Sequence, residues 1–474
     1  MNLASQLKKN FVFISTISIF DKIVSFILVV VIARYLGAAI YGKYAFAVAF
    51  ISFFVLLSDF GITSLITRNV SKDFKSSNYY LSYSFSFKIL ASICSLGLLS
   101  LLIMLIKPLQ ENSSILFLVA IALLIRGITS VFFAIIRAHR KLQYEAIAGF
   151  INRIITASIG ISILILSKNI NYFLIVFLLA CLIELVFVFN IIKRITSFQF
   201  RFDLKVFKTL VVFAFPFMVN GGMSIINYRV DSLIINFEHG SVATGIYNAA
   251  YTIVLSLIII QEIVGRIFLP LFSNLERKDQ GFFVRSFIQV FKLILILALL
   301  IGLIGSFFSN EIIGTIYGTG FETSANCLRI LIWSLFFMFG GYVLTITLIA
   351  KNEEKAVLKA RILTALLNIL LNLILIPQYS FIGASIATIV SEAFFFMFCY
   401  YYLVECIRLP IFDIRTWFKL TFALSVSLVF LFTLNEISVF ILVPIVTVMF
   451  LGILLLVRFV SKEEMYILAK VVSS

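Results

Sequence analysis

Residues 11–33 are FVFISTISIFDKIVSFILVVVIA, an apolar run that is interrupted near its middle by Asp21 and Lys22. A helix needs about 20 residues to cross a hydrocarbon core of roughly 30 Å, so this run predicts a membrane-spanning helix. An ionised side chain at the centre of such a helix costs on the order of 3 kcal/mol. The charged pair therefore indicates that one face of this helix meets polar groups inside the protein instead of lipid.

Thirteen further apolar runs follow the first. The expected spans are 11–33, 42–66, 79–106, 113–136, 144–166, 170–192, 208–235, 242–268, 282–308, 323–349, 355–376, 381–403, 417–434 and 438–459. Of the 474 residues, 62% are hydrophobic and 13% are charged, with a mean hydropathy of +1.14. A soluble chain of this length could not bury so much apolar surface. We predict an all-α integral membrane protein with 14 transmembrane helices.

Few residues are available for enzymatic chemistry. The five cysteines are scattered without metal-ligand spacing, and the two histidines are isolated, so we expect no metal site and no disulfide framework. The first apolar run is too long for a signal-peptide core and has no small-residue cleavage site, which predicts a retained first helix. With no nucleotide-binding loop or catalytic triad, the chain is expected not to be an enzyme and to need no cofactor.

The net charge of +16 is distributed unevenly. Given the expected spans, 27 of the 38 Lys and Arg residues fall on one side of the membrane and five on the other. This asymmetry is the positive-inside pattern of a multi-pass protein in the cytoplasmic (inner) membrane, and it predicts that both termini are cytoplasmic. It also argues against nucleic acid as a partner. A weaker second interpretation is that the segment 193–208 binds anionic lipid headgroups.

The chain resembles itself at a shift of 203 residues. The shift aligns Gly37 with Gly240, Gly42 with Gly245, Tyr44 with Tyr247, Ala47 with Ala250, Asp59 with Glu262 and Arg126 with Arg329. A gapped shift of 208 aligns Glu184 with Glu392. Because each unit contains six spans, the two copies share one orientation and form parallel repeats. The predicted domains are an N-terminal six-helix lobe (1–200), a C-terminal six-helix lobe (201–405), and helices 13 and 14 with a cytoplasmic tail (406–474).

Cations lie near the centres of several spans of the first lobe. They are Lys22, Arg126 and Arg153, with Lys88 as a less central companion. A guanidinium fork matches the oxygens of a phosphate bidentately, so these residues predict a cationic cavity for an anionic substrate. The alternative is that they form fixed ion pairs that hold helices together.

Carboxylates inside the spans are candidates for ion coupling. They are Asp21, Asp59, Glu184, Glu262 and Glu392. A desolvated carboxylate can carry a proton or, with neighbouring amide and hydroxyl oxygens, bind Na⁺. H⁺ and Na⁺ are therefore the candidate coupling ions. Arg229 and Asp231, with Arg329, are candidates for a gating or interlobe pair, although a plain interface salt bridge between the first two is the simpler interpretation.

Several short motifs resemble a known family over nearly the whole chain. They are Asp21-Lys22, Ala33-Arg34-Tyr35-Leu36-Gly37, Tyr41-Gly42-Lys43-Tyr44, Asp59-Phe60-Gly61, Arg68-Asn69, Arg229-Val230-Asp231, Gly245 to Ala250, Ile376-Pro377-Gln378-Tyr379 and Gly383 to Thr388. Their order is similar to that in polysaccharide biosynthesis proteins of the multidrug/oligosaccharidyl-lipid/polysaccharide (MOP) exporter superfamily. The chain departs from the family at Ser380, where glycine is usual.

The resemblance implies a flippase for lipid-linked oligosaccharides. Such a protein moves a polyprenyl-pyrophosphate-linked repeat unit across the cytoplasmic membrane, for O-antigen (lipopolysaccharide), capsule or exopolysaccharide assembly. The implied mechanism is alternating access of two lobes, usually with cation coupling. The implied partners are the lipid-linked substrate, membrane lipids, a polysaccharide polymerase and a chain-length regulator. Related peptidoglycan-precursor flippases imply a role for spans 13 and 14 near the lipid tail.

Three other functions remain open from the sequence. A multidrug exporter of the same superfamily would favour an acidic cavity for cationic drugs, and the first-lobe arginines count against it. A polysaccharide polymerase would need a sizeable extracytoplasmic loop for its chemistry, and no expected loop is that long. A membrane scaffold that transports nothing would leave the buried charges unexplained.

Overall fold

The structure of the protein is a computed structural model that describes residues 3–407, 414–434, 439–457 and 459. Within these residues every regular element is a helix, which confirms the all-α prediction. The predicted cytoplasmic tail beyond residue 459 lies outside the described residues.

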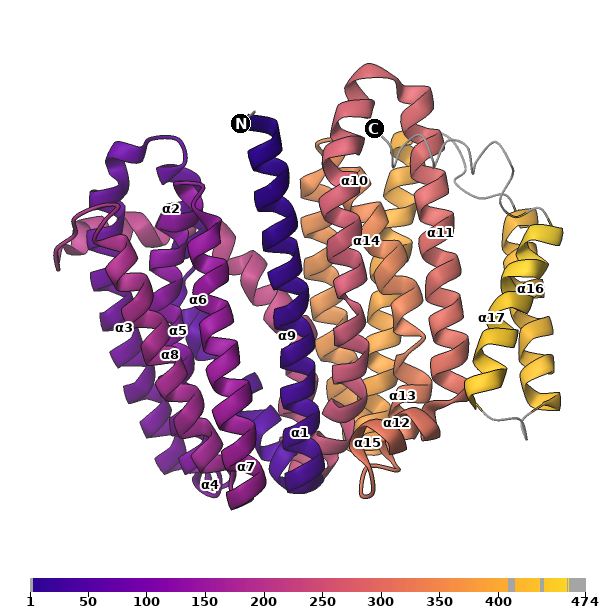
Figure 1. Cartoon of the computed structure of the whole chain (residues 1–474), viewed down its shortest axis with the longest axis horizontal. Coiled ribbons are helices and arrows are strands. Elements are labelled where there is room, and N and C mark those ends of the chain that lie inside the picture. Colours follow the sequence, from indigo (N-terminus) through magenta and orange to yellow (C-terminus); the bar gives the residue numbers. More distant parts are fainter. Residues whose placement is uncertain (1–2, 408–413, 435–438, 458, 460–474) are drawn as a thin grey trace. The chain divides into compact units, whose positions relative to one another are not determined.

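The helices fall into two compact units, Met1–Asn248 and Ala249–Ser474. The first unit contains α1 (Leu3–Asp59), α2 (Ile62–Val70), η1 (Phe74–Ser76), α3 (Ser77–Leu105), α4 (Lys107–Gln110), α5 (Ser113–Ala138), α6 (Leu142–Ile155), the π-helical turn η2 (Thr156–Gly160), α7 (Ile161–Ser167), α8 (Ile170–Ile192) and most of α9 (Leu204–Leu257) (Figure 1). The second unit contains the end of α9, α10 (Ile259–Lys278), α11 (Gln280–Phe307), α12 (Ser309–Tyr317), α13 (Ser324–Leu331), α14 (Ser334–Ala350), α15 (Glu354–Ile407), α16 (Ile414–Thr433) and α17 (Val439–Leu456). The predicted lobe limits at 200 and 405 stay a prediction.

Nine helical stretches of the described residues are long and apolar enough to cross a membrane. Three of them are too long for one crossing: Phe20–Asp59 has 40 residues, Leu204–Glu276 has 73 and Glu354–Cys406 has 53. At 1.5 Å per residue these stretches measure about 60, 110 and 80 Å, against a core of roughly 30 Å. Two shorter apolar helices lie in α16 and α17. The lengths are compatible with fourteen crossings, and that count stays a prediction.

The long helices α1 and α9 each change direction at a glycine of the sequence repeat. Gly37 has φ 76° and ψ 172°, and Gly240 has φ 77° and ψ −175°. Only glycine adopts this region of the backbone map without strain. The two residues that align at a shift of 203 therefore have the same backbone conformation, as duplicated units would.

The next glycines of the motif allow two helices to cross closely. A Cβ added at Gly42 would collide with the backbone carbonyl of Ser241, and one added at Gly245 would collide with the carbonyl of Ala38. Both crossing partners belong to the first unit. In each Gly-x4-Gly motif the first glycine therefore allows the change of direction. The second glycine, five residues later, allows the close backbone contact.

Ser380 makes the corresponding change of direction inside α15, with φ 51° and ψ −133°. A non-glycine residue in such a region costs on the order of 1–3 kcal/mol. We therefore expect Ser380→Gly to raise the thermal stability of the detergent-solubilised protein, by roughly 1 kcal/mol after the extra flexibility of the unfolded chain is subtracted. Gly240→Ser should have the opposite effect, because an added Cβ there meets nothing within 4 Å and only the backbone is strained. An unchanged melting temperature for Ser380→Gly would contradict this account.

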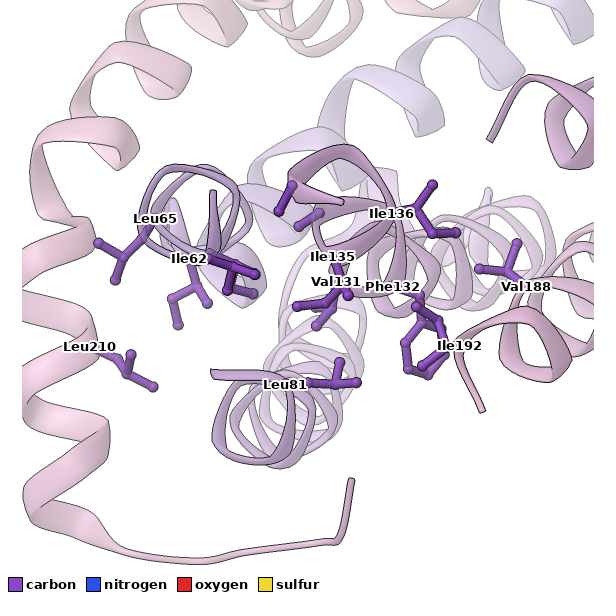
Figure 2. Close-up of a cluster of buried hydrophobic side chains, with 14 of the residues drawn as sticks. Ile62, Leu65, Leu81, Val131, Phe132, Ile135, Ile136, Val188, Ile192 and Leu210 are labelled. Carbon is purple, nitrogen blue, oxygen red and sulfur yellow. The ribbon is translucent and has the colours of Figure 1, made fainter. Parts of the chain in front are cut away.

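The core of the first unit lies where α2, α3, α5, α8 and α9 meet. Figure 2 shows the α5 residues Val131 and Ile135 in the middle of this cluster, with labelled side chains of the other helices on either side of them. Ile66, Val70, Leu81, Phe132 and Ile135 are fully buried. This core fixes the positions of α5 and α8, which carry two of the charged residues described next.

Candidate functional site

The first ion pair of the site joins α1 to α6. Arg153 Nε donates to Asp21 Oδ1 at 2.5 Å, and a terminal nitrogen of Arg153 lies 3.5 Å from Asp21 Oδ2. The Arg153 side chain is 18% exposed and the Asp21 side chain 38%. The residues are 132 positions apart, so the pair depends on the packing of the helices.

A second ion pair joins α5 to α8. Arg126 Nε lies 3.8 Å from Glu184 Oε2, and the buried Asn152 donates from Nδ2 to the same carboxylate oxygen at 3.0 Å. The Glu184 side chain is 2% exposed, whereas that of Arg126 is 39% exposed. The buried Glu184 therefore pairs with Arg126, whose side chain is itself only partly covered by the protein.

The two pairs belong to one electrostatic cluster. Glu184 lies within range of the charges of Arg126, Arg153 and Asp21. The phenol of Tyr44 on α1 lies within range of the charges of Arg153, Arg126 and also Arg229 on α9. We call these three arginines, with the two carboxylates, the arginine cluster. Three cations against two anions leave it with a surplus positive charge inside membrane-spanning helices.

The helix that carries Arg153 is irregular just beyond it. The π-helical turn η2 begins at Thr156, three residues after Arg153, and such turns are frequent at functional sites. Two buried oxygens of this segment, Asn152 Oδ1 and Thr156 Oγ1, have no hydrogen-bond partner among the residues that the structure describes. A buried polar atom of this kind normally meets a water, an ion or a ligand.

Lys88 is brought together with Asp59. Lys88 Nζ lies 3.1 Å from Asp59 Oδ1, and the hydroxyl of Thr63 donates to the same oxygen. The Lys88 side chain is 2% exposed and that of Asp59 is 21% exposed. Gly127 makes room for the lysine, since a Cβ added there would lie 3.0 Å from Lys88 Cε. These two residues form an ion pair between α3 and α1, and their predicted roles in substrate binding and ion coupling stay predictions.

The remaining candidates of the first unit lie on α1 and α9. Lys22 is half-buried beside Asp21. Asp231 is 1% exposed and accepts a hydrogen bond from the hydroxyl of Tyr247 at 2.6 Å. Arg229, two residues earlier, belongs to the arginine cluster through Tyr44. The predicted role of Arg229 and Asp231 in gating stays a prediction.

The candidates of the second unit lie on three helices. Glu392 of α15 is 6% exposed and feels the charge of Arg361, whose guanidinium carbon lies 3.7 Å above the ring of Phe395. Glu262 of α10 is half-buried. Arg329 of α13 is exposed, and its backbone carbonyl accepts a hydrogen bond from Ser306 at 3.0 Å. Their predicted roles stay predictions.

Three residues of these sites were not predicted as site residues from the sequence. Asn152 orients Glu184, Tyr44 lies among the arginines, and Arg361 accompanies Glu392. For two of these three residues, the sequence contained a feature that could have identified them. Asn152 is a buried amide beside Arg153, and the shift of 208 that aligns Glu184 with Glu392 also aligns Arg153 with Arg361.

The second unit also has an apolar groove of about 590 Å³ between α14 and α15. It is lined by Phe337, Leu367, Ile389, Val390, Ala393, Phe394, Met397, Phe398 and Tyr401. Its surface is almost wholly apolar, so it suits a hydrocarbon chain and no charged group.

Comparison with known proteins supports a specific family. The family model described as "Polysaccharide biosynthesis protein" matches residues 7–276, more than half of the chain. The chain belongs to this polysaccharide biosynthesis protein family. The capsular polysaccharide biosynthesis protein CapF of Staphylococcus aureus is 22% identical over 412 residues, which cover 84% of this chain and 99% of CapF. The probable low-salt glycan biosynthesis flippase Agl15 of Haloferax volcanii is 21% identical, covering 79% of each chain.

Among solved structures, the lipid II flippase MurJ in an inward closed conformation has the same fold. The TM-score is 0.78 at 19% identity, and the match covers 94% of this chain and 99% of that one. The family model confirms the predicted polysaccharide biosynthesis family, and the likeness to MurJ confirms the predicted membrane transporter fold. The relatives named as flippases agree with the prediction that the chain is not an enzyme.

Proposed function

We propose that this polysaccharide biosynthesis protein is a flippase for a lipid-linked oligosaccharide. Its substrate is a polyprenyl-pyrophosphate-linked repeat unit that crosses the cytoplasmic membrane for O-antigen, capsule or exopolysaccharide assembly. Relatives named for capsular polysaccharide and glycan biosynthesis, and a structural neighbour named a lipid II flippase, support this class of substrate. The site is exposed alternately to the two sides of the membrane.

The arginine cluster is the observation that carries the proposal. A pyrophosphate brings at least two negative charges into the membrane, where an uncompensated charge is costly. The side chain of Arg126 is 39% exposed and carries a guanidinium fork, while the buried Glu184 lies 3.8 Å from its Nε. A fork of this kind binds phosphate oxygens bidentately. Tyr44 and Asn152 offer hydrogen-bonding groups in the same part of the unit.

The same cluster argues against a multidrug exporter. A cationic drug would be repelled by three arginines, of which only two have a carboxylate within 4 Å among the described residues. The apolar groove between α14 and α15 supplies a surface that a hydrocarbon chain could occupy. An anionic head with a long apolar tail fits these features better than a compact cation does.

Reconstitution tests the proposed function directly. Proteoliposomes that contain the purified protein should move a fluorescent polyprenyl-pyrophosphate oligosaccharide between leaflets faster than empty liposomes. The same vesicles should not accumulate a cationic dye in exchange for an ion gradient. Dye transport without movement of the lipid-linked sugar would favour the multidrug alternative.

We further propose that transport is coupled to H⁺ or Na⁺ through Asp21. A proton or cation on this carboxylate would release Arg153 for the substrate phosphate, because Asp21 and Arg153 share one ion pair. We expect Asp21→Asn to keep basal flipping and to lose its acceleration by an imposed pH or Na⁺ gradient. If Asp21→Asn responds to the gradients as the wild type does, Asp21 is not the coupling residue. The remaining candidates for ion coupling are then Asp59, Glu184, Glu262 and Glu392.

The proposed location is the inner membrane with both termini in the cytoplasm. This follows from the charge asymmetry, by which 27 of 38 basic residues fall on one side. Reporter fusions at residues 200 and 474 should give cytoplasmic signals, and a fusion near residue 318 should give an extracytoplasmic signal. A periplasmic signal at residue 474 would mean an odd number of spans.

A polymerase and a chain-length regulator are the proposed protein partners.

A further inference from the structure

The segment that connects α8 to α9 is an ordered strap that runs along α3. We define the strap as residues 196–203, which have no regular secondary structure. Its backbone is tied to α3 at three points: Asn78 Nδ2 donates to the carbonyl of Ser197 at 2.7 Å, and the amides of Gln199 and Arg201 donate to serine hydroxyls. The acceptors of the latter bonds are Ser82 and Ser86, at 3.1 and 2.9 Å.

Aromatic side chains of the strap point in two directions. The ring centroid of Phe198 lies 5.2 Å from that of Phe85 and 5.6 Å from that of Phe132, inside the core of the unit. Phe200 and Phe202 are 57% and 60% exposed. Residues two apart share a face of an extended chain, so the strap must twist between Phe198 and Phe200. The ring of Phe202 contacts that of the buried Phe207 of α9, with centroids 5.4 Å apart, and more than half of Phe200 and of Phe202 stays exposed.

Basic residues flank these exposed rings in the sequence. They are Lys193, Arg194, Arg201, Lys205 and Lys208, and all five are exposed. The one acidic residue from 193 to 208 is Asp203, whose carboxylate accepts the backbone amide of Lys205 at 2.8 Å and caps α9. The strap and the start of α9 therefore form a positively charged surface with an apolar ridge.

The length of the helical stretch beside the strap places the strap at the boundary between lipid headgroups and acyl chains. The helical stretch Phe74–Leu105, which consists of η1 and α3, has 32 residues. At 1.5 Å per residue it measures about 48 Å, some 18 Å longer than the hydrocarbon core, so its ends project beyond that core. If the excess is shared equally, about 9 Å projects at each end, so Asn78 lies outside the core while Ser82 and Ser86 lie roughly 3 and 9 Å inside its edge. Exposed rings at this depth reach the boundary between headgroups and acyl chains.

We propose that the strap and the first turn of α9 form a binding site for the headgroup of an anionic phospholipid. Arg201, Lys205 and Lys208 contact the phosphate, and Phe200 and Phe202 insert beside its acyl chains. Clusters of four to eight basic residues next to a membrane helix bind anionic lipid, and a neighbouring aromatic ridge adds apolar contact area. The bound lipid belongs to the bilayer and is not the transported substrate, so this site is independent of the proposed flippase activity.

Native mass spectrometry of the purified full chain tests the charge requirement. The protein is titrated with phosphatidylglycerol and, separately, with phosphatidylcholine, and no lipid-linked sugar is present. We expect preference for phosphatidylglycerol, and the triple variant R201Q/K205Q/K208Q should lose about a hundredfold in that preference. The control K141Q/K355Q/K359Q removes three basic charges elsewhere and should bind as the wild type does. Equal losses in both triple variants would overturn the site, because they would report net charge alone.

Photo-crosslinking tests the position of the apolar ridge. A benzophenone amino acid at Phe200 or Phe202 should crosslink to phospholipid, whereas the same group at Phe198 should crosslink within the protein, since that ring contacts Phe85 and Phe132. Phe198 is a matched control, because it lies in the same strap only two residues away. Protein crosslinks at Phe200, or lipid crosslinks of equal yield at all three positions, would contradict the proposal.

Discussion

Replacing Arg126 or Arg153 with alanine is expected to lower flipping of a lipid-linked oligosaccharide about a hundredfold or more. Truncating one partner of a buried charge-assisted contact costs roughly 2–5 kcal/mol. Arg126→Lys should recover only part of the activity, because lysine keeps the charge and lacks the bidentate fork. The measurement is the initial flipping rate in proteoliposomes, normalised to the amount of inserted protein.

A double variant separates substrate binding from a structural ion pair. Arg126→Ala alone leaves the 2% exposed carboxylate of Glu184 without its guanidinium partner and can fail through folding. In Arg126→Ala/Glu184→Gln a neutral side-chain amide replaces that carboxylate. Asn152 can still form a hydrogen bond to this amide. If Arg126 binds substrate, the double variant should regain expression and thermal stability and remain inactive. Recovery of flipping in the double variant would show that the two residues only hold α5 to α8.

Arg137 provides a matched control on the same helix. It forms a bidentate ion pair with Glu145, at 2.8 and 2.6 Å, and its side chain is 40% exposed. An exposed pair of this kind contributes about 0–1 kcal/mol. Arg137→Ala should therefore leave both stability and flipping close to the wild-type values. A loss as large as that of Arg126→Ala would mean that transport depends on the overall charge of α5.

Asp59→Leu is expected to have the largest effect on stability. It leaves the ammonium of Lys88, 2% exposed, without the carboxylate that lies 3.1 Å away. An unpaired buried charge costs about 3–5 kcal/mol. Lys88→Met should cost much less, because the remaining carboxylate of Asp59 is 21% exposed and keeps its bond from Thr63. The measurement is the melting temperature of the detergent-solubilised protein.

The double variant Asp59→Leu/Lys88→Met completes this test. Both charges are then gone, so most of the stability lost in Asp59→Leu should return. If the double variant is also active, neither residue binds the substrate or the coupling ion. Stable protein without activity would instead return both residues to the list of functional candidates. Equal destabilisation by the two single variants would contradict the burial of Lys88 described here.

The sequence was sufficient for the helices because the membrane provides an external length scale. Apolar runs of about twenty residues correspond to the thickness of the hydrocarbon core, and the described helices follow those runs. The repeat was also visible, since turns such as those at Gly37 and Gly240 require glycine for a backbone reason. Ser380 shows the limit of that reasoning, because the same kind of turn occurs there without glycine.

Local sequence was a poor guide to the partners of the charges. Asp21 precedes Lys22 and Arg229 lies near Asp231, which suggested local pairs. Residues one or two positions apart do not face each other on a helix. In the structure, the carboxylate of Asp21 contacts Arg153 instead.

What the sequence determined by itself is the class of protein: apolar periodicity, charge asymmetry and duplicated glycines depend only on local chemistry and on the bilayer. What only the tertiary structure decided is which charges meet. Arg126 with Glu184 and Lys88 with Asp59 are pairs between helices, separated by 58 and 29 positions in the chain. Ion-pair geometry depends on how the helices rotate and pack against one another, and that is set by the whole core of the unit. The pairing of the partly exposed Arg126 side chain with a buried carboxylate is therefore a property of the fold.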